Sequence, residues 1–96
     1  MTSRSGRVTI PAGGQKTVIA DGLTGNTHAM YRFFNSGKIG QKIEIWEKNA
    51  GQALAELEWK DSVDVPVAKK AIIVKAVGGG TDPPPAEVVY DFLGLA

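Results

Sequence analysis

The 96-residue chain has no cysteine, no long apolar segment and no marked excess of charge of either sign. The absence of cysteine excludes disulfides and thiolate metal sites and is compatible with a reducing compartment such as the cytoplasm. No stretch approaches the roughly 18 apolar residues of a membrane-spanning helix. The opening MTSRSGRVTIPAGG has no apolar run after its arginines, so it does not predict a secretory signal. We expect no membrane partner, and the localisation stays open between a cytosolic and an exported role.

The charged residues nearly balance, with 11 Lys and Arg against 10 Asp and Glu and a formal net charge of +1. The basic residues are scattered, and only Lys69 and Lys70 are adjacent. Binding to nucleic acid usually requires basic side chains clustered on one face, because the phosphate backbone supplies most of the affinity. We therefore expect no nucleic-acid partner.

The 12 glycines and 5 prolines divide the chain into short runs with strand-like alternation. Ninety-six residues are enough for one domain, 1–96. We predict a flexible N-terminus over 1–6 and a Gly/Pro-rich loop over 78–85, GGGTDPPP. The predicted strands lie within 7–12, 16–21, 28–35, 42–48, 52–60, 63–65, 70–77 and 87–93. Apart from Arg32 and its end residues, run 28–35 is apolar on both faces, which predicts a central strand covered on both sides.

The segment 42–60, KIEIWEKNAGQALAELEWK, predicts a β-hairpin. We place Asn49, Ala50 and Gly51 in a three-residue loop, with Gly51 in the left-handed conformation. This register pairs Ile43 with Leu57, Glu44 with Glu56, Ile45 with Ala55 and Trp46 with Leu54. One face is then mainly apolar and the other mainly charged, and burial of the apolar face fixes the register. Good helix formers over 52–60 leave a helix as the alternative there.

These runs predict an all-β fold: an antiparallel two-sheet β-sandwich of seven or eight strands, immunoglobulin-like or jelly-roll-like. The cysteine–tryptophan–cysteine pattern of true immunoglobulin domains is absent. We expect the core to contain Val8, Ile10, Phe33, Ile43, Ile45, Leu57, Trp59, Val63, Val65, Ile72, Val74, Val88 and Tyr90.

A search for catalytic or metal-binding patterns yields little. His28 is the single histidine and has no second histidine or cysteine with which to form a transition-metal site. Glu44 faces Glu56 in the predicted hairpin, but neighbouring lysines indicate a solvated, mixed-charge face. The glycines of 78–80 are followed by prolines rather than by a helix, so no phosphate-binding helix N-terminus is expected. We expect no enzyme activity, no catalytic residue, no metal and no cofactor.

The tryptophans differ in their predicted surroundings. Trp59 falls on the apolar face of the hairpin, whereas Trp46 falls on the charged face opposite Leu54. A large ring on a charged face stacks on a sugar, enters a partner, or lies under neighbouring lysine stems. The chain also ends in an apolar run that contains Phe92 and Leu93.

The first hypothesis is therefore a non-catalytic binding or assembly module. It would self-associate or bind a protein partner through Trp46, Leu54, Phe92 and Leu93. The alternative is a small carbohydrate-binding, lectin-like module that uses Trp46 with Asn26, Asn35 and Tyr31. A small enzyme or a metal-binding domain is a distant third.

Overall fold

The computed structural model describes residues 5–19, 28–68, 70–77 and 85–95, and these residues form an all-β structure of eight strands. The strands are β1 (Ser5–Ile10), β2 (Gln15–Ile19), β3 (Ala29–Asn35), β4 (Ile43–Glu47), β5 (Ala55–Leu57), β6 (Ser62–Val67), β7 (Ile72–Ala76) and β8 (Ala86–Leu95). The predicted all-β sandwich is confirmed, and the helix alternative for 52–60 is wrong.

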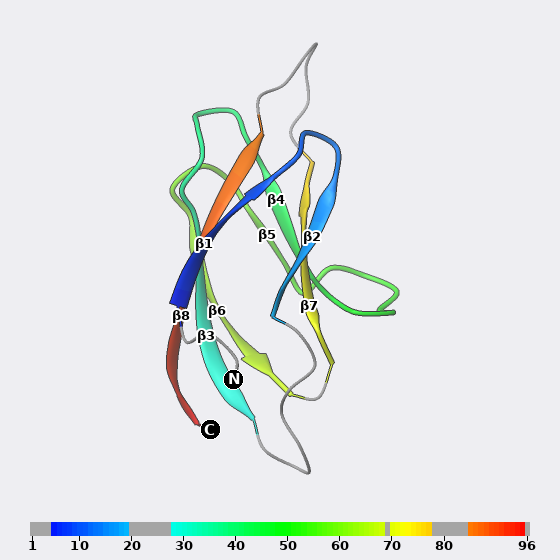
Figure 1. Ribbon diagram of the computed structural model, residues 1–96, viewed down its shortest axis with the longest axis vertical. Helices are drawn as coiled ribbons and strands as arrows, with labels where there is room; N and C mark the ends of the chain where they lie inside the picture. The colour runs from blue at the N-terminus through cyan, green and yellow to red at the C-terminus, as the bar shows by residue number, and fades with distance from the viewer. Residues whose placement is uncertain (1–4, 20–27, 69, 78–84, 96) are drawn as a thin grey trace.

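The strands pair as the first half of the chain against the second half in reverse order. β1 pairs with β8, β2 with β7, β3 with β6, and β4 with β5, each antiparallel. Further pairing of β3 with β8 and of β4 with β7 closes two four-stranded sheets, β1-β8-β3-β6 and β2-β7-β4-β5. A long antiparallel ribbon rolled up in this way is a jelly roll. Figure 1 shows the two sheets face to face. The longest extent of the molecule is 44 Å.

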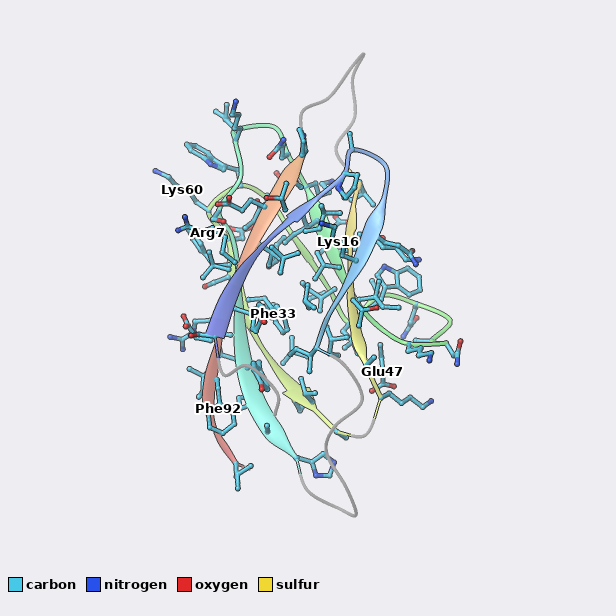
Figure 2. All side chains as sticks on the ribbon, viewed as in Figure 1. Arg7, Lys16, Phe33, Glu47, Lys60 and Phe92 are labelled. Carbon is cyan, nitrogen blue, oxygen red and sulfur yellow. The ribbon has the colours of Figure 1, made fainter. Side chains whose placement is uncertain are left out.

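The core lies between the sheets and comes from alternate positions of each strand. In β3, Ala29, Tyr31, Phe33 and Asn35 are buried, and Phe33 lies in the middle of the sandwich in Figure 2. The fully buried apolar side chains, each at 0% exposure, are Ile10, Phe33, Ile43, Ile45, Ile72, Val74 and Val88. This alternation with a period of two is what directs one face of each sheet inward. The predicted core is confirmed for all its members except Val8, Val63 and Trp59, which are partly buried.

The predicted register of the hairpin is confirmed for three pairs, whereas the predicted Trp46–Leu54 pair is not part of the ladder and the turn is different from the predicted one. Ile43 pairs with Leu57, Glu44 with Glu56, and Ile45 with Ala55. The ladder between β4 and β5 ends at the pair of Ile45 with Ala55. Beyond this pair, the Leu54 N–H donates to the Ile45 carbonyl at 2.7 Å. The left-handed residue is Asn49, at φ 64°, in a turn closed by the bond from the Ala50 N–H to the Glu47 carbonyl. The prediction of a left-handed Gly51 is wrong, since asparagine also adopts this conformation readily and was the residue that the turn used.

Three further expectations need correction. Trp59 follows β5 and lies at an end of the sandwich rather than in the core, because the chain turns at Lys60, whose φ is 69°. β3 is central in its sheet, but its outer face exposes Arg32, so it is not covered on both sides. Residues 5 and 6 belong to β1 and pair with β8, so that part of the predicted flexible N-terminus is ordered. Residues 1–4 and most of the predicted loop, 78–84, lie outside the described residues.

Candidate interaction surfaces

A tight turn between β3 and β4 presents an isoleucine to solvent. The Gln41 N–H donates to the Lys38 carbonyl at 3.0 Å, and Gly40 has φ 87°. These features define a type II turn, in which glycine at the third position supplies the positive φ. Ile39 occupies the second position and is 78% exposed, the largest exposure among the large apolar residues that the structure describes. The turn therefore holds an apolar side chain in water.

Asn35 anchors this turn from inside the protein. Its side chain is fully buried and donates from Nδ2 to the carbonyls of Gln41 (3.0 Å) and Leu57 (3.2 Å). Its Oδ1 accepts from the Gly37 N–H at 3.2 Å. These bonds join the end of β3 to the turn and to β5, in the opposite sheet. A buried amide must be satisfied in this way, because an unpaired polar group in the core is costly.

Gln41 completes the network. It is 6% exposed, its Oε1 accepts from the Lys38 N–H at 2.8 Å, and its Nε2 donates to the Pro85 carbonyl at 2.7 Å. A Cβ added at Gly37 would overlap Gln41 Oε1, so glycine is needed there for the close approach. Among the described residues, no buried side-chain nitrogen or oxygen lacks a partner. Nothing in the local sequence pattern indicates this network, because its asparagine and glutamine resemble ordinary surface residues.

Trp59 packs beside the same turn. Its indole N–H donates to the Gly37 carbonyl at 3.1 Å, and Lys60 Nζ lies 4.6 Å from the centre of its ring. Lys38 and Lys60 are both exposed, and neither forms an ion pair within the part of the chain that the structure describes. We call the group Lys38, Ile39, Trp59 and Lys60 the loop end. It combines one exposed and one half-buried apolar side chain with two ammonium groups.

An open hollow of about 390 Å³ lies next to the loop end. Its lining consists of Thr9, Ser36, Gly37, Lys38, Pro85, Ala86 and Glu87. Two of its polar groups, Ser36 and Glu87, already form bonds within the protein. Ser36 Oγ donates to Glu87 Oε1 at 2.9 Å, and Arg7 Nε lies 3.6 Å from the same oxygen. The hollow is at the small end of the range of ligand pockets, and these internal bonds compete with any ligand.

The last residues of β8 form a second exposed apolar group. Tyr31 pairs with Phe92 and Met30 with Gly94, so Leu93 is the extra residue of a β-bulge. Leu93 is 44% exposed and Leu95 is 71% exposed. Together with the exposed Asp91 they form what we call the tail end. Phe92 is different from them, because its ring packs edge-on against Tyr31 with centroids 5.5 Å apart and extends the core.

Two charged groups near the tail end largely neutralise one another. Arg32 donates to both carboxylate oxygens of Asp64, at 2.8 and 3.1 Å. This pairing lowers the pKa of Asp64 below its ordinary value. Asp64 raises the pKa of Arg32, first through the hydrogen bond and then through its charge, and Asp91 adds to this effect. One cation and two carboxylates leave a net negative charge beside Leu93 and Leu95.

The outer face of the second sheet carries Trp46. Its indole N–H donates to Glu44 Oε1 at 2.9 Å, and Lys75 Nζ lies 3.8 Å from the centre of its ring, on the face of the ring. Trp46 is half-buried and faces Ile73 of β7, while Leu54 is 48% exposed in the segment that joins β4 to β5. The predicted Trp46–Leu54 pair lies beyond the β4–β5 ladder, so the structure does not bring them together as strand neighbours.

The other residues considered for chemistry are placed as follows. His28 is exposed, and Glu56 contributes with Glu58 to an ion-pair group around Lys42. Asn35 and Tyr31, named for sugar binding, are buried, and Asn26 lies outside the described residues. In the part of the chain that the structure describes, no three His, Asp or Glu side chains gather where they could hold a metal ion.

Comparisons with known proteins add no relative. No protein-family model matches the chain, and no curated protein matches it significantly. Within the described ranges there is no helix of sufficient length and apolarity to cross a membrane. The surfaces themselves are therefore the basis for a proposal about function.

Proposed function

We propose that the protein is a non-catalytic assembly module that self-associates through apolar side chains exposed on its strands. One observation carries this proposal: Leu93 and Leu95 lie in solvent on an ordered strand, at 44% and 71% exposure. Moving a leucine side chain from water into an interface contributes roughly 1.5–3 kcal/mol. A contiguous group of exposed apolar side chains can mark an interaction site, and a bulge at a sheet edge re-aims side chains.

The strand pairing around β8 supports the same proposal. β1 pairs with β8 from Ala86 to Asp91, so in the described residues the strand neighbour of 93–95 is β3. An exposed strand edge pairs readily with another chain. Two other edges are poorer candidates for such pairing, because β6 contains Pro66 and β5 has three residues.

The sugar-binding alternative has weaker support. It relied on Trp46 together with Asn35 and Tyr31, and the last two are buried. The ring of Trp46 is partly covered by Lys75, which competes with a sugar for the same face. Jelly rolls occur both in capsid proteins and in lectins, so the fold itself does not choose between assembly and sugar binding.

Sedimentation-velocity ultracentrifugation tests the proposal. We expect the wild type to self-associate with rising concentration, and Leu93→Ser with Leu95→Ser to weaken association. A chain truncated at Tyr90 is unsuitable, because it removes Phe92 and four of the seven residue pairs between β3 and β8. Trp46→Ala and Leu54→Ser test whether Trp46, on the outer face of the second sheet, and the exposed Leu54 contribute to association. A wild type that remains monomeric at high concentration contradicts the proposal, and binding on a glycan array would then favour the lectin-like alternative.

A further inference from the structure

We propose that copies of this chain associate head to tail, with the loop end of one copy receiving the tail end of the next. The loop end is Lys38, Ile39, Trp59 and Lys60, and the tail end is Asp91, Leu93 and Leu95. This inference rests on the proposed self-association and names its geometry.

The apolar centres of the two groups lie towards opposite ends of the molecule. In Figure 1 the loop between β3 and β4 is in the upper part, and the end of β8 is in the lower part beside the C-terminus. Figure 2 labels Lys60 in the upper part of the molecule and Phe92 in the lower part. One molecule therefore cannot bring its own loop end and tail end together, whereas two stacked copies can.

The loop end is built to hold an apolar side chain in a fixed position. Ile39 sits on a turn closed by the Gln41–Lys38 backbone bond and braced by the Asn35 and Gln41 side chains. The second position of such a turn accepts most residues, so the turn does not require an isoleucine. The fold does not bury Ile39 either, since it is 78% exposed. A rigid, exposed apolar side chain next to a half-buried tryptophan has the character of an interface centre, with little ordering entropy lost on binding.

The charged groups that border the two apolar centres differ in sign. At the loop end, the ammonium groups of Lys38 and Lys60 border the apolar side chains, and the exposed carboxylate of Asp61 accepts from the Glu58 N–H at 3.2 Å. Glu56 and Glu58 are held by Lys42 at 3.4 and 3.5 Å. At the tail end, Asp91 adds a carboxylate to the Arg32–Asp64 pair. Ammonium groups around one apolar centre and a carboxylate beside the other favour contact between unlike ends.

Contacts between like ends lack this complementarity. Two loop ends would bring the ammonium groups of Lys38 and Lys60 from both copies into one interface, and two tail ends would bring together both Asp91 carboxylates. An interface between unlike surfaces leaves a free loop end and a free tail end after each addition. Such assembly continues into a filament, or stops when the rotation between neighbours closes a ring.

Mixing two blocked variants tests this geometry. Ile39→Asp blocks the loop end and keeps the tail end, while Leu95→Asp does the reverse. We expect each variant alone to be monomeric, because its constant for self-association should be at least about tenfold lower than that of the wild type. An equal mixture should form dimers that grow no further, because each such dimer uses the one intact loop end and the one intact tail end. Gln52→Asp, a substitution at an exposed position outside both ends, should assemble like the wild type.

Other outcomes separate the two proposals. If the wild type and Ile39→Asp assemble equally while Leu95→Asp does not, self-association stands and the head-to-tail geometry is wrong. If both variants are monomeric and mixing restores no dimer, the geometry is again wrong. A wild type that stays monomeric overturns the proposed function itself. Circular dichroism and the urea midpoint confirm that each variant is folded, and both substituted side chains are exposed, so folding is expected to persist.

Discussion

Gln41 joins the two halves of the chain, because its side-chain Nε2 donates to the Pro85 carbonyl, 44 residues away, at 2.7 Å. The same side chain accepts from the Lys38 N–H, so one residue fixes both the turn that presents Ile39 and the start of β8. The stability of the fold and the shape of the loop end therefore depend on the same small group of buried amides.

The first prediction concerns the other amide of this group. Asn35→Ala leaves the carbonyls of Leu57 and Gln41 without their buried donor. Each unsatisfied buried group costs about 1–3 kcal/mol, so the free energy of unfolding should fall by roughly 2–4 kcal/mol. Urea denaturation followed by tryptophan fluorescence measures this. Gln52→Ala, at an exposed position, is the control and should change stability by less than about 0.5 kcal/mol.

The second prediction compares two glycines. Gly37→Ala should be destabilising by about 1–3 kcal/mol, because its new Cβ meets Gln41 Oε1. Gly51→Ala should be close to neutral or slightly stabilising, because its φ is not positive and nothing lies within 4 Å of the added carbon. Thermal unfolding of the two variants side by side tests this. Equal losses would mean that the contact between Gly37 and Gln41 has no special role.

The third prediction concerns the core. Ile45→Ala removes a fully buried side chain from the central strand β4 and should lower stability by about 2–5 kcal/mol. Ile73→Ala, on the half-buried outer face of the neighbouring strand, should have a smaller effect. The difference between the two urea midpoints measures the inward orientation of β4. A larger loss at Ile73 would contradict it.

The fourth prediction concerns pH. Arg32 lowers the pKa of Asp64 in the folded protein below its ordinary value of 3.8. The folded state thus binds this proton less readily than the unfolded state, and the contribution of the pair is present above pH 3.8 and lost as the pH falls further. Asp64→Asn should therefore lose less stability than the wild type between neutral pH and acid. Parallel pH–stability curves would show instead that the exposed pair contributes nothing measurable.

Much of the fold followed from local pattern. Alternation with a period of two placed the strands and chose the inward faces of β4 and β7, because successive side chains of a strand point to opposite sides of the sheet. The placement of a loop at 49–51 predicted the pairing of Ile43 with Leu57, and burial of the apolar face holds that register. Local pattern did not give the turn, since both Asn49 and Gly51 tolerate the left-handed conformation and the loop geometry selected Asn49.

Only part of the candidate surfaces could be predicted from the local sequence pattern. The exposure of Leu93 agrees with its assignment to an apolar strand end, whereas Phe92 turned out to extend the core against Tyr31. Ile39 was missed, because a single apolar residue between Lys38 and Gly40 has no periodicity to mark it. Its significance depends on a turn whose supports come from Asn35, Leu57 and Pro85.

The sequence by itself determined the class of the protein: short alternating strands, one buried face per sheet, and no disulfide. Only the tertiary structure decided the jelly-roll order, the burial of Asn35 and Gln41, and the separation of the loop end from the tail end. The physical reason is that strand alternation is a local property, read from neighbouring residues. The partners of a buried amide and the two ends of a molecule are set by contacts between segments far apart in the chain.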